Sequence, residues 1–366
     1  MGWQKELRNS VTTIEQLKEY VKLSAKEETE LRHVLKVHPM RVSQYYLSLI
    51  DWNNPNDPIK KMAIPSKEEL DLTGLYDTSG EHENTKIKGV QHKYSRTVLL
   101  LSTNNCATYC RYCFRKRLIG LPTEEILHRF NSAAKYIQNH KEINNILISG
   151  GDPLTLPTKT IEKFLAQLSQ IKHLDFIRFG TKILAALPRR ITEDKNLLRL
   201  LESNSHIDRR IFFVTQFNHP NEITNKTLAA VDLLLKHKVI ISNQTVLLKG
   251  VNDDYETMAA LQNKLVSIGI NPYYIFQCRP VKRVKNNFQV PLYKGYEIIE
   301  AAKKEMSGHG KRFRYVMSHH TGKIEILGIV DNYINLKYHQ ARNEKDIGKI
   351  FKKKINQTAG WLEDLE

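Results

Sequence analysis

Three of the four cysteines of this chain lie within eight residues, in the segment NNCATYCRYC. Cys106, Cys110 and Cys113 have the spacing CxxxCxxC. Three thiolates can hold three irons of a four-iron cluster and leave the fourth iron open to a ligand. A structural zinc site is the alternative, but it needs four protein ligands, and the one other cysteine, Cys278, lies far along the chain. The spacing therefore favours an open [4Fe-4S] cluster over zinc.

A second candidate site is the segment SGGDPL, residues 149–154. Its paired glycines, Gly150 and Gly151, expose backbone groups that can form hydrogen bonds with the charged ends of a bound ligand. Taken alone, the segment is also compatible with an ordinary glycine-rich turn. Its interest comes from its position directly after a predicted strand.

The elements that must position these motifs alternate regularly along the chain. Short apolar runs, mostly β-branched or aromatic, predict strands at Val98–Leu101, Asn145–Ser149, Phe176–Gly180, Ile211–Val214, Val239–Val246 and Tyr273–Phe276. Segments of helical period lie between and after them, at Thr123–Asn139, Lys159–Leu168, Thr192–Ser203, Asn221–Lys236, Asp254–Ile268 and Gly295–Met306. This alternation predicts an α/β fold of parallel βαβ units, six of which can curl into a full or partial barrel. Ligands of such sheets sit at the carboxyl ends of the strands.

Three regions are expected along the chain. Residues 1–94 predict a helical N-terminal extension, with Thr13 as a helix cap and a linker at Asp77–His92 that is rich in turn formers and charges. Residues 95–330 predict the barrel, closed by the apolar runs Phe313–Met317 and Ile324–Val330. Residues 331–366 predict a short, basic C-terminal tail, in which Lys345–Lys354 is expected to form a solvated helix face.

Composition limits the class of protein. The chain has 366 residues, 41% of them hydrophobic, and a formal net charge of +17. It can bury a sizeable core, and its charge favours acidic partners such as phosphates, nucleic acid or an acidic protein. The longest aliphatic run, Val98–Leu101, is far too short to cross a membrane. The N-terminus has no apolar export segment, so we expect a cytoplasmic protein without disulfides.

The cysteine spacing directly after the first strand resembles the radical S-adenosylmethionine (SAM) superfamily. In that superfamily a [4Fe-4S] cluster passes an electron to SAM, which is cleaved to methionine and a 5′-deoxyadenosyl radical that abstracts hydrogen from the substrate. The resemblance implies a partial (βα)6 barrel. It assigns the three cysteines as cluster ligands and gives positions in contact with SAM to Tyr112, Ser149, Gly150, Gly151, Asp152, Lys182 and Gln244. Tyr112 would pack on the adenine, and Asp152 would be the acidic partner of the SAM amino group.

Nearly the whole length of the chain resembles one branch of that superfamily, the lysine 2,3-aminomutase family. The matching segments are QYYLSLIDWNNPNDPIKKMAIPS, HKYSRTVLLL, CRYCFRKRLIG, ILISGGDPL, TQFNHPNEIT, NQTVLLKGVND and NPYYIFQC. The family also contains glutamate and arginine aminomutases and the enzyme that rearranges a lysine of elongation factor P. The resemblance implies a shift of an α-amino group to the β-carbon, assisted by pyridoxal phosphate in an imine with the migrating nitrogen.

The residues that would bind pyridoxal phosphate and substrate match the family unevenly. Arg115 stands where the family places an arginine for the substrate carboxylate, and a guanidinium suits that group. Lys323, in SHHTGK, stands where the family has its Schiff-base lysine after a glycine-rich stretch, although an ordinary turn lysine is the alternative. Arg96 is a candidate for the cofactor phosphate, offset by one position from the family's arginine. His219 would contact a cofactor or cap a loop.

The substrate position departs from the lysine enzymes. They carry an aspartate for the substrate ammonium after the segment PYYIFQC, whereas this chain has Arg279. A guanidinium repels an ammonium in a pocket of low dielectric constant. The segment SHHTGK also lacks the second aspartate expected just before the glycines. Both differences disfavour free lysine and favour an amino acid with a distal anion, such as glutamate.

Several expectations concern other partners. The resemblance implies an electron donor such as flavodoxin or ferredoxin, a small amino acid as substrate and a homo-oligomer, and we expect neither zinc nor nucleic acid. Two alternatives stay open: a relative that performs another hydrogen abstraction without pyridoxal phosphate, and an aminomutase that acts on a protein-bound lysine. An iron–sulfur protein that binds nucleic acid is a further alternative, but it leaves SGGDPL and Arg115 unexplained.

Overall fold

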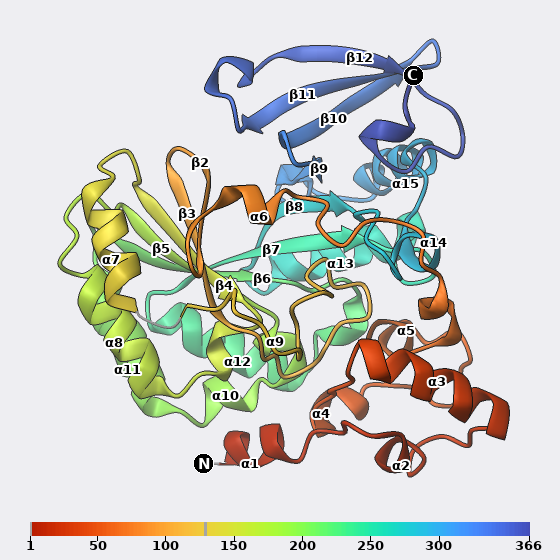
Figure 1. Ribbon diagram of the computed structural model, residues 1–366, viewed down its shortest axis with the longest axis horizontal. Coiled ribbons are helices and arrows are strands. Elements are labelled where there is room, and N and C mark those ends of the chain that lie inside the picture. Colours follow the sequence, from red (N-terminus) through yellow and green to blue (C-terminus); the bar gives the residue numbers. More distant parts are fainter. Residues whose placement is uncertain (1, 128–129) are drawn as a thin grey trace.

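The computed structural model describes residues 2–127 and 130–366. At its centre twelve strands form one sheet and follow one another in chain order (Figure 1). The six strands in its middle run parallel, namely β3 (Thr97–Thr103), β4 (Asn145–Gly150), β5 (Phe176–Thr181), β6 (Arg210–Thr215), β7 (Ile240–Leu247) and β8 (Asn271–Gln277). A helix follows each of them: α7 (Phe130–Asn139), α8 (Thr158–Leu168), α11 (Lys195–Asn204), α12 (Asn225–Lys236), α13 (Tyr255–Ser267) and α15 (Leu292–Lys304). The six predicted βα units are confirmed.

The sheet does not close. Its edge strands, β1 (Thr85–Ile87) and β12 (Ile350–Lys354), each pair with one neighbour and not with each other. The result is a partial barrel, as predicted. Its parallel strands place their carboxyl ends at one rim, where the cysteine loop and SGGDPL leave β3 and β4.

The sequence pattern accounts for the layers of this barrel. In β3 the side chains of Val98 and Leu100 are fully buried. In α8 the buried residues Ile161, Leu165 and Leu168 recur at helical spacing and form the face that packs on the sheet. Burial of each such side chain contributes about 1.5–3 kcal/mol.

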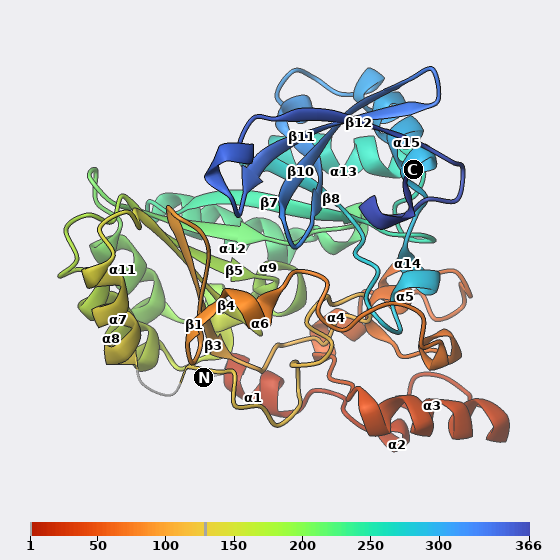
Figure 2. The same ribbon diagram turned by 45° about the horizontal axis from the view of Figure 1, so that its top comes forward.

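The N-terminal extension is helical, as predicted. Its helices are α1 (Gly2–Arg8), α2 (Ile14–Leu17), α3 (Ala25–Val37), α4 (Gln44–Leu47), α5 (Pro58–Ala63) and the 3-10 helix η1 (Lys67–Leu70). Thr13 caps α2 as expected, because its hydroxyl accepts from the amide of Gln16 and the Gln16 side chain accepts from the amide of Thr13. Figures 1 and 2 show these helices and the C-terminal strands on opposite sides of the barrel.

The prediction of an irregular linker at Asp77–His92 is wrong. This segment contains the helix α6 (Glu81–Asn84), the strand β1 and the start of β2 (Val90–Tyr94). β2 pairs antiparallel with β3 and buries Val90. Hydrogen bonding to a buried strand outweighs the weak local propensity of the polar sequence VQHKY.

The helix predicted at Thr123–Asn139 is shorter in the structure. α7 begins at Phe130, and residues 123–127 are not helical. The amide of Leu127 donates to the carbonyl of Leu101, 2.8 Å away, which holds this segment against β3. The predicted positions 128–129 lie outside the described residues.

The C-terminal region continues the sheet. β9 (Arg314–Ser318) is parallel to β8, and β10 (Gly322–Val330), β11 (Tyr333–Ala341) and β12 are antiparallel. The helix face predicted at Lys345–Lys354 is therefore wrong. In IFKKK the exposed and partly buried positions alternate with the period of a strand, and Phe351 lies opposite Leu336 of β11.

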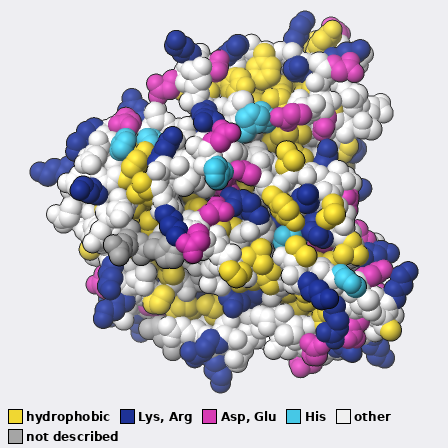
Figure 3. Space-filling model, in the orientation of Figure 1, with side chains coloured by type: hydrophobic (Ala, Val, Ile, Leu, Met, Phe, Trp, Pro, Cys, Tyr) yellow, Lys and Arg dark blue, Asp and Glu magenta, His cyan; other side chains and the backbone are white. Residues whose placement is uncertain are grey.

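Shorter helices complete the described chain: α9 (Ile183–Ala186), α10 (Arg189–Thr192), α14 (Lys285–Phe288), η2 (Pro153–Thr155), η3 (Pro220–Glu222), η4 (Gly310–Arg312), η5 (Glu344–Asp346) and η6 (Leu362–Asp364). Among the described residues, no helix combines the length and apolar character needed to cross a membrane. Lys and Arg side chains are spread over the whole visible face of the molecule and are not gathered in one patch (Figure 3).

Candidate active site

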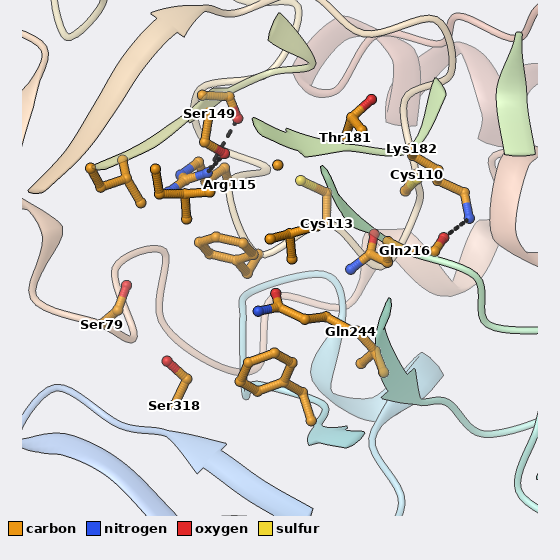
Figure 4. Close-up of a pocket in the computed structure, with 18 of the residues that line it drawn as sticks. Ser79, Cys110, Cys113, Arg115, Ser149, Thr181, Lys182, Gln216, Gln244 and Ser318 are labelled. Carbon is orange, nitrogen blue, oxygen red and sulfur yellow. Dashed lines mark hydrogen bonds between the residues drawn. The ribbon is translucent and has the colours of Figure 1, made fainter. Parts of the chain in front are cut away.

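One cavity of about 350 Å³ is lined by most of the residues selected from the sequence. They approach it from the cysteine loop, the ends of several parallel strands and the C-terminal strands (Figure 4). The predicted residues that line it are Cys106, Cys110, Tyr112, Cys113, Arg115, Ser149, Gly150, Gly151, Asp152, Lys182, Gln244, Arg279 and Lys323. The fold therefore brings them together, while the role of each stays a prediction.

The cysteine loop is held from two sides. On the side of the N-terminal extension, the amide of Tyr109 donates to the Arg41 carbonyl and that of Arg111 to the Met62 carbonyl, both at 2.8 Å. On the side of the barrel, the amide of Asp152 donates to the Asn105 carbonyl, also at 2.8 Å. The three thiols consequently face the cavity from a fixed backbone.

The thiols suit a metal cluster by their chemistry. Burial raises the pKa of Cys113 to about 11, and burial likewise raises the pKa values of Cys106 and Cys110 above the usual range. A thiolate in this place therefore needs a positive charge such as bound iron. The fourth cysteine, Cys278, also lines the cavity, but its Sγ is directed to the Arg279 carbonyl, 3.8 Å away.

The turn after β4 packs directly on the cysteine loop. Gly150 has a φ of +106°, which favours glycine, and a Cβ on Gly151 would overlap the carbonyl of Asn105. The buried Asp152 accepts from the Thr181 hydroxyl and the amide of Lys182, each at 2.8 Å. Burial raises the pKa of Asp152 above its usual value. Asp152 therefore joins the ends of β4 and β5, whatever else it binds.

Tyr112 and Lys182 belong to a polar network that was not predicted. The hydroxyl of Tyr112 accepts from Asn218, at 2.6 Å, and donates to the side chain of Gln216, at 3.3 Å. Lys182 forms an ion pair with the buried Glu222. Its amine also donates to the Gln216 carbonyl, at 2.8 Å (Figure 4). The positive charge of Lys182 is thus neutralised inside the protein.

His219 lies beside this network, but it does not line the cavity. Its Nδ1 accepts from the amide of Asn221, at 3.2 Å, and caps η3. Of the two roles considered for it, the structure supports the cap.

Two arginines flank one aromatic ring. The guanidinium carbons of Arg115 and Arg279 lie 4.5 Å and 4.2 Å from the centre of the Phe114 ring. Arg115 is oriented by the buried Glu81, at 2.9 Å, and by the Ser149 hydroxyl, at 3.2 Å. This arrangement holds two guanidinium groups at separate places in the same cavity.

Arg279 has spare capacity to bind a ligand. Its Nη2 donates to Ser318, at 2.8 Å, whereas its buried Nη1 has no hydrogen-bond partner among the described residues. Burial lowers the pKa of Arg279 to about 10, so that it keeps its charge at neutral pH. A buried cation with an unused donor is costly unless an anion binds there.

Lys323 lies at the start of β10, and its Nζ is 4.3 Å from the centre of the Tyr274 ring. Among the described residues, no hydrogen bond or ion pair to this amine is present. Burial lowers the pKa of Lys323 to about 7, assisted by the charges of Arg178, Lys93 and Arg279. A large fraction of this amine is therefore neutral, and nucleophilic, at physiological pH.

Sequence reasoning missed two of these cations. Lys93 lies on β2, just after the segment predicted as a linker, and its amine donates to the His319 carbonyl, at 2.5 Å. Arg178 lies on β5, where alternation with the buried Ile177 and Phe179 could have indicated that it faces the other side. Arg96, the phosphate candidate, is instead exposed and does not line the cavity.

Basic side chains outnumber acidic ones in the cavity. Among the described residues it is lined by six basic residues, Lys93, Arg115, Arg178, Lys182, Arg279 and Lys323, and by two carboxylates, Glu81 and Asp152. Both carboxylates are already engaged, Glu81 by two arginines and Asp152 by Thr181 and backbone amides. The arrangement suits ligands that carry several negative charges.

Comparisons with known proteins find radical SAM enzymes among the proteins similar to this chain. The model of the radical SAM superfamily matches residues 100–261. A putative L-lysine 2,3-aminomutase of Aquifex aeolicus is 43% identical over 349 residues, which are 95% of this chain and 93% of that protein. The L-lysine 2,3-aminomutase of Clostridium subterminale is 39% identical over 310 residues, 84% of this chain and 73% of that protein. The glutamate 2,3-aminomutase of Clostridioides difficile is 36% identical over 312 residues, which are 84% of this chain and 71% of that protein.

Proposed function

The chain belongs to the lysine 2,3-aminomutase family of radical SAM enzymes, and from this premise we propose that it moves the α-amino group of a glutamate-like amino acid to the β-carbon. Membership of the family makes the chain a radical SAM isomerase with a [4Fe-4S] cluster and SAM. Identities of 36–39% to lysine and glutamate enzymes do not choose between their substrates. The proposal for the substrate therefore comes from the charges of the cavity.

One observation carries the choice of substrate. The buried Arg279 keeps its charge and has an unpaired Nη1, while both carboxylates that line the described cavity are engaged by the protein itself. A lysine side chain would bring an ammonium into a site without a free anion. A second carboxylate on the substrate would instead pair with Arg279, a buried cation whose Nη1 has no hydrogen-bond partner among the described residues.

We assign the two ends of the substrate to the two arginines beside Phe114. Arg115, held by Glu81 and Ser149, suits the α-carboxylate, and its fixed orientation would define the position of the reacting carbons. Arg279, with its unpartnered Nη1, suits the distal carboxylate. Truncation of one partner of a buried charge pair typically costs 2–5 kcal/mol.

Lys323 is the proposed attachment point of pyridoxal phosphate. Its amine is neutral in large part, has no competing partner among the described residues and faces the cavity. Arg178 and Lys93 are cations in its neighbourhood and suit the phosphate of the cofactor. Bound there, pyridoxal phosphate would supply a π-system that stabilises the radical while nitrogen migrates.

The remaining steps belong to residues of this chain. The cysteine loop would hold the cluster, and the turn after β4 would present backbone groups to SAM. Phe114, Tyr273 and Phe276 line the cavity and would limit the access of water to the bound substrate and cofactors. The protein contributes position and exclusion, while the cofactors carry the chemistry.

The substrate assignment can be tested with the reconstituted enzyme under anaerobic conditions. L-glutamate and L-lysine are supplied separately, and their β-isomers are measured by mass spectrometry. We expect turnover of glutamate, a loss of roughly a hundredfold or more in Arg279→Ala, and little change in Arg314→Ala, which removes an exposed arginine from β9. Turnover of lysine and not of glutamate would overturn the substrate assignment and leave the family membership intact.

A further inference from the structure

Two basic side chains of the cysteine loop are buried as deeply as the hydrophobic core. Arg111 lies between Cys110 and Cys113, and Lys116 follows Cys113 by three residues. Their exposed fractions are 2% and 5%, and the Glu69 side chain that binds both of them is 0% exposed. None of the three lines the ligand cavity. The proposed reaction gives these residues no role, although buried charges are costly to keep.

Arg111, Lys116 and Glu69 are connected by hydrogen bonds and ion pairs. Arg111 binds Glu69 through Nε and Nη2, both at 2.7 Å. Lys116 lies 2.5 Å from the same carboxylate and donates to the Arg111 carbonyl, at 2.7 Å. The other N–H groups of Arg111 donate to the carbonyls of Pro39 and His38, at 2.9 and 3.3 Å.

The network keeps a net positive charge. Burial opposes ionisation of Glu69, yet the charges of Arg111 and Lys116 outweigh it and lower the pKa of this carboxyl to about 2. Burial lowers the pKa of Lys116 only to about 8, because Glu69 opposes the loss of its proton. Two cations therefore face one anion at pH 7. Arg283 adds a further cation, since it donates to the Glu69 carbonyl, at 2.7 Å.

This charge acts on the cysteine loop. The Lys116 ammonium donates to the carbonyl of Arg111, 2.7 Å away, and Arg111 directly follows Cys110. The charge of Lys116 therefore lies against the backbone segment that carries Cys110 and Cys113. Inside the protein such an interaction is screened much less than it would be in water.

We propose that the buried Lys116–Glu69–Arg111 network sets the reduction potential of the [4Fe-4S] cluster, with Lys116 as the residue that raises it. A cluster held by three thiolates is negatively charged, and it becomes more negative when it accepts one electron from the external donor. A buried cation bound to the backbone of the cysteine loop stabilises the reduced form more than the oxidised form. Glu69 moderates this effect and ties it to the N-terminal extension, since it lies on η1.

The test is a redox titration of the reconstituted cluster at pH 7, followed by the electron paramagnetic resonance signal of its reduced form, without substrate or pyridoxal phosphate. We expect the midpoint potential to shift to more negative values in Lys116→Met and to more positive values in Glu69→Gln. Lys116→Arg keeps the positive charge and should therefore have the same midpoint potential as the wild type. Lys236→Met, which removes an exposed lysine from α12, should leave it unchanged.

The opposite signs separate this role from a purely structural one. A network that only holds the loop would give the same change in both variants, such as a loss of iron or a broadened signal, and that result would overturn the proposal. Equal potentials in all variants would overturn it as well. If Lys116→Met binds no cluster, the direction of the shift in midpoint potential is taken from Glu69→Gln and Lys116→Gln instead. Shifts of the same sign in these two variants would then overturn the proposal. The measurement does not depend on which amino acid is the substrate.

Discussion

Burial and neighbouring positive charge each favour the neutral form of a lysine amine, and both act on Lys323. It is enclosed by Tyr274 and Phe276, whose ring centres lie 4.3 and 5.8 Å from its Nζ. Arg178 and Lys93 add positive charge. The same residues that make the amine nucleophilic also suit the anions of the cofactor that it is proposed to bind.

This environment predicts the pH dependence of cofactor attachment. The rate at which pyridoxal phosphate becomes attached to Lys323, fixed by borohydride and located by peptide mass spectrometry, should rise with pH and level off above an apparent pKa of about 7. Lys323→Arg should give no attachment at this position. A profile that still rises steeply above pH 9, as for an exposed lysine, would contradict the proposed environment.

At the scale of elements, the active site depends on close contact between the loop that follows β3 and the turn that follows β4. Gly151 has no side chain at the point where the carbonyl of Asn105 passes, one residue before the first cluster cysteine. Small residues are required where two backbones approach so closely.

Gly151→Ala should therefore lower the amount of iron bound per chain after reconstitution, because the new Cβ displaces the cysteine loop. Overpacking of this kind typically costs 1–3 kcal/mol, so we also expect a lower thermal midpoint. Gly308→Ala is the matched control, since no atom lies within 4 Å of its added Cβ. Normal iron content in Gly151→Ala would show that the two loops are not coupled in this way.

The elements that the sequence predicted correctly are those with a strong local pattern. The parallel strands and their helices have clear periods, and the cysteine spacing is specific, so the core of the barrel and the site residues on it could be found. β2 and β12 could not, because VQHKY and IFKKK are polar and become strands only through their partners β3 and β11. Lys93 was missed together with β2, since only the pairing of that strand carries it into the cavity.

The whole molecule combines a net charge of +17 with a cavity in which basic side chains outnumber acidic ones. Burial, assisted by the charges of neighbouring basic residues, lowers the pKa values of Lys93 and Lys323 in this cavity. In the unfolded chain both lysines have their ordinary pKa of 10.5, compared with about 7 in the folded chain.

Between pH 7 and pH 8, below the ordinary thiol pKa of 9.0, the unfolded chain therefore binds more protons through these two lysines, and the free energy of unfolding of the cofactor-free protein should rise with pH. Each lysine contributes a slope of up to about 1.4 kcal/mol per pH unit. Urea unfolding between pH 7 and pH 8 measures the slope, and Lys323→Met should make it smaller. An equal slope in this variant would mean that Lys323 keeps an ordinary pKa in the folded protein.

In the proposed reaction, a radical made from SAM in this cavity removes hydrogen from the β-carbon of a glutamate-like substrate. The most direct test of this step is transfer of the isotope from L-glutamate deuterated at C3, in anaerobic enzyme reconstituted with iron, sulfide, SAM and pyridoxal phosphate. We predict deuterium in the recovered 5′-deoxyadenosine and formation of β-glutamate. Cleavage of SAM without deuterium in the nucleoside, together with transfer from deuterated lysine, would contradict the account.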